Sequence, residues 1–200
     1  LDNGITLEVI FNQVKQIREK SDIPIALMGY YNPILKMGQE SFIKECTLSD
    51  IDGIILPDLP LEEAKEFCDM SKASKISPIL LVAPNSSKER IKKISELAGD
   101  LIYAVSILGI TGNELSSKTK LKNYLNRVRE NSQTPFVVGF GISTREDVQW
   151  FNKHSDGAVV GSAIIEKLST SKEINEPETS KKTAKKTTAK KTTAKKTTAK

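Results

Sequence analysis

The chain has 200 residues, of which 38% are hydrophobic and 28% charged, and its formal net charge at neutral pH is +5. This length is enough for one domain with a buried core. The last twenty residues contain nine lysines and no acidic residue, so residues 1–180 carry 21 basic and 25 acidic side chains, a net charge of −4. The part of the chain that can fold is therefore mildly acidic, and its composition gives no indication of nucleic-acid binding.

Cysteine usage and hydropathy exclude several classes of protein. Cys46 and Cys68 stand alone in helical patterns, without the Cys-x-x-Cys spacing of a zinc site or the framework of a disulfide-rich domain, which is typical of a reducing cytosol. The sequence has no apolar run long enough to span a bilayer and no signal peptide, so we expect a cytoplasmic protein that binds no metal. Because the first residue is Leu1 instead of Met, we expect the chain to begin partway through a gene product.

The chain alternates patterns typical of helices and of short buried strands. Helices are expected from Thr6, as N-cap, to near Lys20, and then around 42–46, 62–71, 88–97, 121–129 and 148–151. Strands are expected at 24–28, 53–56, 78–82, 101–105, 136–138 and 158–160. This alternation predicts parallel βα units, and its spacing predicts about six of the eight strands of a (β/α)8 TIM barrel.

Two successive strands end in glycine, the first at Gly139-Phe140-Gly141 and the second at Gly161. Glycine lets backbone N–H groups approach a ligand without a Cβ in the way, and Ser162 can open a helix whose N-terminus favours an anion. Such a pair of loops after the last two strands is typical of a phosphate site on a (β/α) barrel. The alternative is that the glycines only permit tight turns. A dinucleotide-binding fingerprint is rejected, because no third glycine follows at the required spacing.

Polar side chains follow two earlier strands. Residues 30–32, two tyrosines and an asparagine, either line a pocket or plug the mouth of the barrel, and we favour the pocket. Asp58 stands where barrel enzymes place catalytic groups, or it only caps a helix that starts near Pro60. The glycine-containing loop at 106–112 is a candidate lid, and the lone His154 is expected at the surface.

The C-terminal region has a different composition. Residues 171–180 are predicted to be a polar linker, and residues 181–200 form lysine, threonine and alanine repeats that are too poor in apolar residues to build a core. We therefore expect a disordered tail. Its lysine pairs can attract nucleic-acid phosphates without reading sequence, or the tail is only a solubilising or accidental extension, which is the interpretation we favour.

Five motifs, in order, make the chain similar to the tryptophan synthase alpha subunit family from about Leu1 to Lys167. They are Met28-Gly29-Tyr30-Tyr31-Asn32-Pro33, Leu56-Pro57-Asp58-Leu59-Pro60, Gly109-Ile110-Thr111-Gly112, Gly139-Phe140-Gly141-Ile142-Ser143 and Gly161-Ser162-Ala163-Ile164. The resemblance implies a partial (β/α)8 barrel over residues 1–170. It also implies a lyase of tryptophan biosynthesis that cleaves indole-3-glycerol phosphate to indole and glyceraldehyde 3-phosphate by a retro-aldol reaction, without metal or cofactor.

The same resemblance implies a partner and a role for individual residues. The partner is a beta subunit, which holds pyridoxal phosphate, in an alpha2-beta2 heterotetramer that passes indole between subunits. The implied phosphate ligands are Gly112, Gly141, Gly161 and Ser162, the indole-pocket residues are Met28, Tyr103 and Phe140, the lid residue is Thr111, and the residues toward the beta subunit are Asn32, Asp58 and Pro60.

The chain also departs from the family's pattern. The family's two catalytic carboxylates follow its first and second strands, and this chain starts after both. The usual final helix is shortened or replaced by the lysine tail, and Ile107 stands where many relatives carry arginine. Because the reaction needs both an acid and a base, and Asp58 alone cannot supply both, we expect these 200 residues to be inactive alone. The alternatives are another phosphate-binding biosynthetic barrel, or a nucleic-acid-binding protein acting through its tail.

Overall fold

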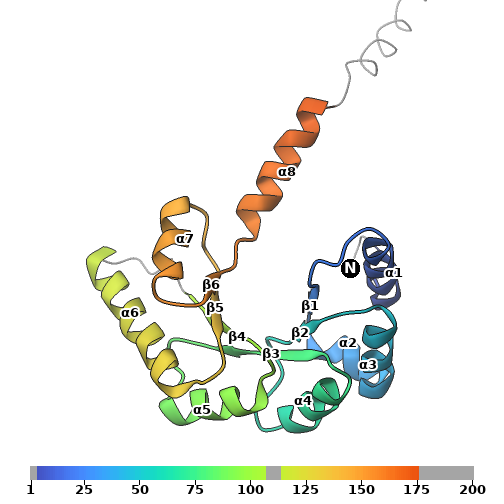
Figure 1. Ribbon diagram of the computed structural model, residues 1–200, viewed down its shortest axis with the longest axis horizontal. Helices are drawn as coiled ribbons and strands as arrows, with labels where there is room; N and C mark the ends of the chain where they lie inside the picture. Colours follow the sequence, from blue (N-terminus) through green and yellow to red (C-terminus); the bar gives the residue numbers. More distant parts are fainter. Residues whose placement is uncertain (1–3, 107–113, 176–200) are drawn as a thin grey trace, which may run out of the picture. The chain divides into compact units, whose positions relative to one another are not determined.

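The computed structural model describes residues 4–106 and 114–175 of the chain. These residues belong to two compact units, Leu1–Ser162 and Ala163–Lys200, and each unit is described by itself. Within the described residues, the first unit contains a six-stranded sheet and the helices that connect its strands (Figure 1). The described part of the second unit continues one helix, α8 (Ser162–Asn175), which extends past residue 170 into the segment predicted to be a linker.

All six strands are parallel, and each pairs with the next strand along the chain. The strands are β1 (Ala26–Met28), β2 (Gly53–Ile55), β3 (Ser77–Val82), β4 (Ile102–Val105), β5 (Phe136–Gly139) and β6 (Gly157–Ala158). This order confirms the predicted partial TIM barrel. It leaves β1 and β6 as the edge strands of the sheet that the structure describes.

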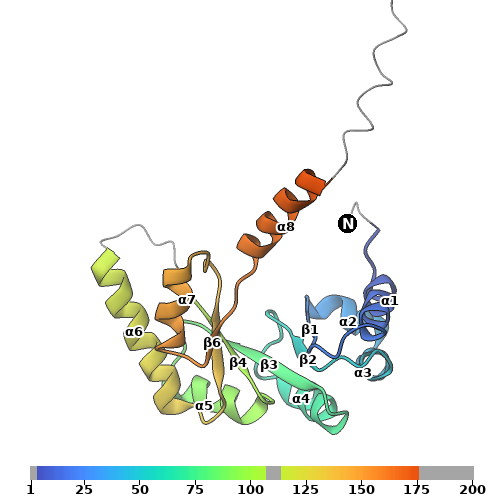
Figure 2. The same ribbon diagram turned by 45° about the horizontal axis from the view of Figure 1, so that its top comes forward.

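Helices connect successive strands and cover the sheet. They are α1 (Leu7–Arg18), α2 (Tyr31–Met37), α3 (Gln39–Leu48), α4 (Ala64–Ala73), α5 (Lys88–Leu97), α6 (Glu114–Asn131) and α7 (Arg145–Asn152). The α4 and α5 helices both pack on β3, and the turned view of Figure 2 shows them along the same side of the sheet. Thr6 caps α1 as predicted, because its hydroxyl oxygen accepts the N–H of Val9 at 3.3 Å.

Two predicted elements near the start of the sheet differ from the structure. No helix was predicted directly after the first strand, but α2 begins at Tyr31, and Pro33 falls in its first turn, where its missing N–H has no intrahelical partner to lose. The strand predicted to be buried at 24–28 is limited to 26–28. Ala26 and Met28 are exposed there, since β1 is an edge strand.

Two expectations about single residues also need correction. The helix predicted to start near Pro60 begins at Ala64 instead. His154 is partly buried and not simply a surface residue, since its ring stacks on Trp150 with the ring centroids 4.1 Å apart. The contact arises because helix-like turns continue past the end of α7 at Asn152, where the His154 N–H donates to the Phe151 carbonyl, so that the two rings, four residues apart, lie on one face.

Two apolar clusters hold the helices against the sheet. The larger one brings Ile102 of β4 and Phe136 of β5 against Leu125 of α6, and all three side chains are fully buried. The smaller one packs Phe11 of α1 against Phe42 of α3, with the ring centroids 5.8 Å apart. Full burial of such a side chain contributes about 1.5–3 kcal/mol. The position of each helix is therefore fixed mainly by apolar packing.

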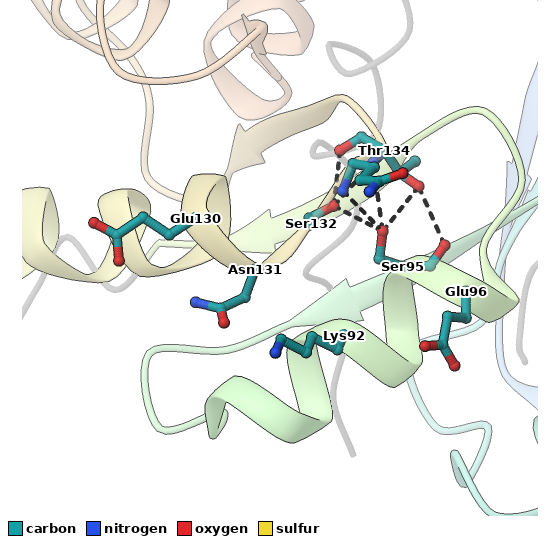
Figure 3. Close-up of a pocket in the computed structure, with 8 residues that line it drawn as sticks. Lys92, Ser95, Glu96, Glu130, Asn131, Ser132 and Thr134 are labelled. Carbon is teal, nitrogen blue, oxygen red and sulfur yellow. Dashed lines mark hydrogen bonds between the residues drawn. The ribbon is translucent and has the colours of Figure 1, made fainter.

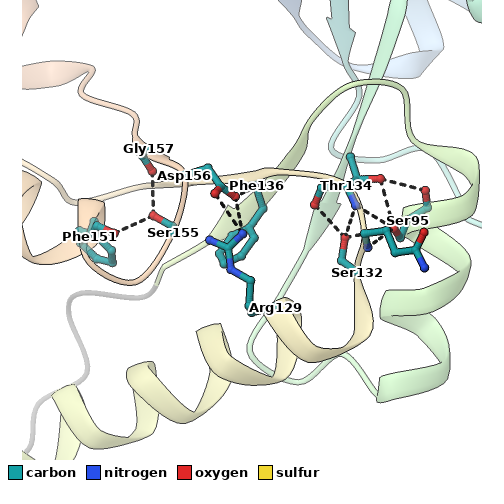
Figure 4. A network of polar contacts seen from close by, with 10 residues as sticks. Ser95, Arg129, Ser132, Thr134, Phe136, Phe151, Ser155, Asp156 and Gly157 are labelled. Carbon is teal, nitrogen blue, oxygen red and sulfur yellow. Dashed lines mark hydrogen bonds and ion pairs between the residues drawn. The ribbon is translucent and has the colours of Figure 1, made fainter.

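An ion pair closes the amino end of the β5–β6 strand pair. Arg129, near the end of α6, bonds both carboxylate oxygens of Asp156 at 2.8 and 3.0 Å (Figure 4). Asp156 stands directly before β6. Its carboxylate also accepts the N–H of Phe136 at 2.9 Å, and its own N–H donates to the Phe136 carbonyl at 3.0 Å. One aspartate therefore ties a helix end to the first residues of two strands.

The β1–β2 pair at the other edge has the same arrangement. Arg18, the last residue of α1, bonds Asp52 at 2.5 Å, and Asp52 stands directly before β2. Asp52 accepts the N–H of Ile25 at 2.7 Å, and its own N–H donates to the Ile25 carbonyl at 3.0 Å. Both edge strands are short, so this pair of arginine–aspartate clamps supplies hydrogen bonds that a three-residue or two-residue ladder lacks.

The pH dependence of the Asp156 clamp follows from its contacts. Burial by itself would raise the pKa of Asp156, but hydrogen bonds from Arg129 and from the Phe136 N–H outweigh it and lower that pKa. The ionised carboxylate therefore stabilises the folded protein above the unfolded pKa of about 3.9. That stabilisation is lost as the pH falls through the lower pKa of the folded state.

We predict that Asp156→Asn lowers the free energy of unfolding at pH 7 by about 1 kcal/mol, a modest value because solvent screens a half-exposed pair. Urea denaturation at pH 7 and pH 3 measures the effect. The difference in the free energy of unfolding between the variant and the wild type should be smaller at pH 3 than at pH 7. Asp69→Asn is the control, since it removes only the surface pair with Lys65 and should change stability little. Equal losses in the two variants would contradict the clamp.

Candidate functional site

The carboxyl ends of β4, β5 and β6 meet at one edge of the sheet. Val105 pairs with Gly139, and Val138 pairs with Ala158, so the residues that follow these three strands lie side by side. The Val159 N–H extends the ladder by donating to the Val138 carbonyl at 2.7 Å. The two glycine loops of the sequence therefore leave the sheet next to each other, at the edge where parallel sheets bind ligands.

An aromatic pair forms the apolar part of this edge. Tyr103 of β4 is 6% exposed, and its ring meets Phe140 edge to face, with the centroids 5.7 Å apart and the planes at 69°. Phe140, directly after β5, keeps 48% of its surface exposed. Burial raises the pKa of Tyr103, so its phenol stays protonated at neutral pH. The site thus presents a neutral aromatic wall with one accessible ring.

The aromatic pair depends on a glycine beside it. A Cβ on Gly139 would lie 1.8 Å from the Tyr103 hydroxyl oxygen, which is impossible without a shift. Gly139 was part of the motif at the end of β5 but was not selected as a site residue from the sequence. The signal was present, since glycine in the last position of a strand often marks a close approach of another group.

The loop after β5 has an unusual backbone. Phe140 has φ +76° and Gly141 has φ +77°, so two successive residues are in the left-handed region. The following helix, α7, uses its own capping box, in which Thr144 accepts the N–H of Asp147 and the Asp147 carboxylate accepts the N–H of Thr144. The alternative that the glycines only permit tight turns therefore accounts for Gly141, because its positive φ favours glycine.

Gly161 and Ser162 follow β6, and both are exposed. Gly161 does not have a positive φ. Among the described residues, no atom lies within 4 Å of a Cβ built on it. Neither turn geometry nor packing explains glycine at this position. Open backbone at the first residues of α8 is the arrangement that an anion-binding loop requires.

Met28 lies at a different place in the sheet. It is 51% exposed at the edge strand β1, which is separated from β4 by β2 and β3. With Tyr30 it lines an apolar cavity of about 380 Å³ between β1, β2 and the helices α1 to α3. The segment at 30–32 thus divides: Tyr30 faces that cavity, whereas Tyr31 is buried against Phe67, with ring centroids 5.9 Å apart.

Asp58 has a third role that the sequence did not suggest. Its carboxylate accepts the N–H of Tyr31, the first residue of α2, at 2.9 Å. It therefore caps a helix that precedes it in the chain, instead of one that starts near Pro60, and so ties the loop after β2 to the loop after β1. Asp58 and Pro60 are exposed on the loop after β2, and Asn32 is exposed in the first turn of α2. Thr111 and Gly112 lie outside the described residues.

A second, polar cavity lies at the amino end of β5. Its volume is about 580 Å³, and hydroxyl groups of Ser95, Ser132 and Thr134 line it (Figure 3). The Ser132 hydroxyl oxygen lies 3.0 Å from the Ser95 hydroxyl oxygen and 2.9 Å from the Thr134 carbonyl oxygen. Because these hydroxyls bond one another, the network joins α5 to the start of β5, and it lies at the opposite end of the strand from the glycine loops.

Residues 4–106 and 114–175 contain neither a metal site nor a membrane-spanning helix. No group of three or more histidine, cysteine, aspartate or glutamate side chains is placed to hold a metal ion. None of the described helices is both long enough and apolar enough to cross a membrane. Burial raises the pKa of Cys46 to about 12 and that of Cys68 to about 11, so both thiols stay protonated and unreactive at neutral pH.

Comparison with known proteins identifies the family. A family model described as tryptophan synthase alpha chain matches residues 1–197. This chain belongs to the tryptophan synthase alpha chain family. It is 42% identical over 173 residues to the tryptophan synthase alpha chain of Petrotoga mobilis, covering 86% of this chain and 67% of that protein. It is also 42% identical over 172 residues to the Bacillus mycoides protein of the same name, again covering 67% of it.

Solved structures show the same relationship. The chain superposes on the tryptophan synthase complex from Pyrococcus furiosus with a TM-score of 0.74 and 35% identity, covering 84% of this chain and 68% of that one. A further structure from that organism, of its tryptophan synthase a2b2 complex, gives a TM-score of 0.76 and 36% identity. Family membership places the chain in tryptophan biosynthesis, among lyase-type enzymes. The alternatives of another biosynthetic barrel or a nucleic-acid-binding protein are not favoured.

We predict that Gly139→Ala lowers the free energy of unfolding of this protein by about 1–3 kcal/mol, because the new Cβ overlaps the Tyr103 hydroxyl. Gly157→Ala on the neighbouring strand is the matched control. Its Cβ would meet only Val137 Cγ1, at 3.2 Å, so it should cost less. Urea denaturation of Gly139→Ala, Tyr103→Ala and the double variant should show that the double variant is less destabilised than the sum of the single ones. If the free-energy losses of the two single variants simply add in the double variant, the predicted overlap of the new Cβ with the Tyr103 hydroxyl is wrong.

Proposed function

We propose that these 200 residues form the phosphate-binding and indole-binding part of a tryptophan synthase alpha subunit that acts on indole-3-glycerol phosphate. The observation that carries the proposal is the edge shared by β4, β5 and β6, where an aromatic pair stands beside two glycine loops. An indole ring needs an apolar wall, and the half-exposed ring of Phe140, held by Tyr103, offers an edge-to-face or stacked partner.

The phosphate of the substrate is assigned to the two loops that flank this wall. Gly141 contributes backbone N–H groups from a turn with positive φ, and Gly161 contributes open backbone without a side chain. Ser162 adds a hydroxyl at the first residue of α8, where uncompensated N–H groups and the helix dipole favour an anion. Thr111 and Gly112 complete the proposed lid and phosphate ligands.

The acid and the base of the retro-aldol reaction are assigned to groups outside these 200 residues. Protonation of the indole ring carbon and removal of a hydroxyl proton need two positioned groups. Asp58 alone cannot supply both roles, and one of its carboxylate oxygens already accepts the N–H of Tyr31. The chain spans 67% of the length of the Petrotoga mobilis relative, so the relatives have further residues to supply them.

The proposed partner is a tryptophan synthase beta subunit in an alpha2-beta2 heterotetramer. Support comes from the Pyrococcus furiosus protein, which is an a2b2 complex and is 36% identical to this chain. The residues proposed to face that subunit are exposed: Asn32 in the first turn of α2, and Asp58 and Pro60 on the adjoining loop after β2. We propose a cytoplasmic location, no metal and no cofactor in this subunit, and pyridoxal phosphate only in the beta subunit. The lysine-rich tail is assigned no role in nucleic-acid binding.

The phosphate assignment predicts that Gly161→Asp weakens binding of sn-glycerol 3-phosphate about a hundredfold or more, because it adds a negative charge beside the bound anion. Isothermal titration calorimetry at low ionic strength measures the dissociation constant. Gly161→Ala is the control: its Cβ meets no described atom within 4 Å, so the fold and most of the affinity should remain. Unchanged binding by the aspartate variant would overturn the phosphate assignment.

The acid–base assignment predicts that the purified 200-residue chain releases no detectable indole from indole-3-glycerol phosphate, even with a beta subunit added. Each missing acid–base group typically contributes about 10² to 10⁴ in rate. Adding a polypeptide that carries the first two βα units of a relative should restore turnover. Indole release by the chain alone would show that a carboxylate within it transfers the protons.

A further inference from the structure

A buried serine lies between the aromatic pair and the glycine loop. Ser106 is the first residue after β4 and is 2% exposed. Its N–H donates to the Gly139 carbonyl at 2.8 Å, and its hydroxyl lies 2.8 Å from that same carbonyl oxygen and 2.6 Å from the Phe140 carbonyl oxygen. One side chain therefore holds two successive carbonyls at the end of β5.

These contacts fix the direction of the neighbouring N–H groups. In a trans peptide the C=O and N–H bonds point in opposite directions. Because Ser106 holds the carbonyls of Gly139 and Phe140, the N–H groups of Phe140 and Gly141, which belong to the same two peptide planes, point away from it. In the part of the chain that the structure describes, neither N–H has an acceptor. Successive N–H groups that point to one side form an anion-binding concavity.

The held conformation is one that the chain does not adopt freely. Phe140 has φ +76°, in the left-handed region where its Cβ crowds the backbone. Such a residue persists only when surrounding contacts determine it. Two contacts from the strand β4 and its end do so here: the Ser106 hydroxyl binds the Phe140 carbonyl, and Tyr103 packs against the Phe140 ring.

We propose that Ser106 is a positioning residue for the phosphate loop, which holds Phe140 in its left-handed conformation and so aims the N–H groups of Phe140 and Gly141 at the ligand. This inference rests on the proposed function, because it deepens the assignment of the loop after β5 to the substrate phosphate. Ser106 touches no ligand in this arrangement. It acts only through the two carbonyls that it holds.

The chain contains a matched control for this role. Ser155 is also buried, at 7% exposure; its N–H and its hydroxyl both donate to the Phe151 carbonyl at 2.8 Å, and its hydroxyl also lies 3.0 Å from the Gly157 carbonyl oxygen (Figure 4). Its bonding matches that of Ser106. The difference is position, because Ser155 precedes β6 at the amino end of the sheet, away from the glycine loops.

The test compares Ser106→Ala with Ser155→Ala in the full 200-residue chain. Both should lower the unfolding midpoint in urea, since each removes a hydroxyl donor while the backbone N–H of the substituted residue still binds its carbonyl. Only Ser106→Ala should weaken binding of sn-glycerol 3-phosphate. The dissociation constant should rise about tenfold, as expected when one hydrogen bond from the loop to the ligand is lost through misalignment. Ser106→Thr, which keeps the hydroxyl, should bind more tightly than Ser106→Ala. Wild-type affinity in Ser106→Ala, or an equal loss in Ser155→Ala, would overturn the inference.

Proton NMR, measured without ligand, separates this inference from the proposed function. In Ser106→Ala the nuclear Overhauser contacts between the rings of Tyr103 and Phe140, whose centroids lie 5.7 Å apart, should weaken, whereas in Ser155→Ala they should not. Failure of the wild type to bind the phosphate would overturn the phosphate assignment, while the ring contacts still decide whether Ser106 holds the loop. Unchanged ring contacts in Ser106→Ala would overturn the positioning role whatever the ligand result.

Discussion

The parallel direction of the six strands constrains everything else in the first unit. A parallel pair needs a crossover connection, so a helix separates every strand from the next and packs on the sheet. All carboxyl ends consequently lie at one edge and all amino ends at the other. The aromatic pair and the glycine loops are at the carboxyl edge, while the arginine–aspartate clamps and the hydroxyl network are at the amino edge. Contacts that bind ligand and contacts that only stabilise the fold are thereby separated in space.

The two clamps show how the sheet manages its ends. The edge strands β1 and β6 have three and two residues, too few for a ladder that holds them by itself. In each case an aspartate lies directly before the second strand of the pair. Its N–H donates to a carbonyl at the start of the first strand, and its carboxylate accepts the N–H of that same residue and binds an arginine near the end of the helix that precedes the first strand. The same solution at both edges indicates that it answers a geometric requirement of short parallel edge strands.

The glycines of the site have different physical causes, although they look alike in the sequence. Gly139 is required by the Tyr103 hydroxyl, which occupies the place of its Cβ. Gly141 is favoured by its positive φ. Gly161 has neither constraint, and its open surroundings are the feature that suggests a ligand. The strained backbone at Phe140 is then held by groups of β4, so neighbouring strands act together at the site.

The sequence by itself determined the alternation of strands and helices, and with it the parallel partial barrel and its family, because hydrophobic periodicity and local motifs are properties of neighbouring residues. It predicted the helix at 88–97 to the residue and the end of β5 to within one residue, but it placed the last strand at 158–160, whereas β6 is 157–158. It did not predict α2, the edge exposure of Met28, or the capping of α2 by Asp58. Only the tertiary structure decided these, and the roles of Ser106 and Gly139, because each depends on contacts between residues 27 to 36 positions apart in the chain.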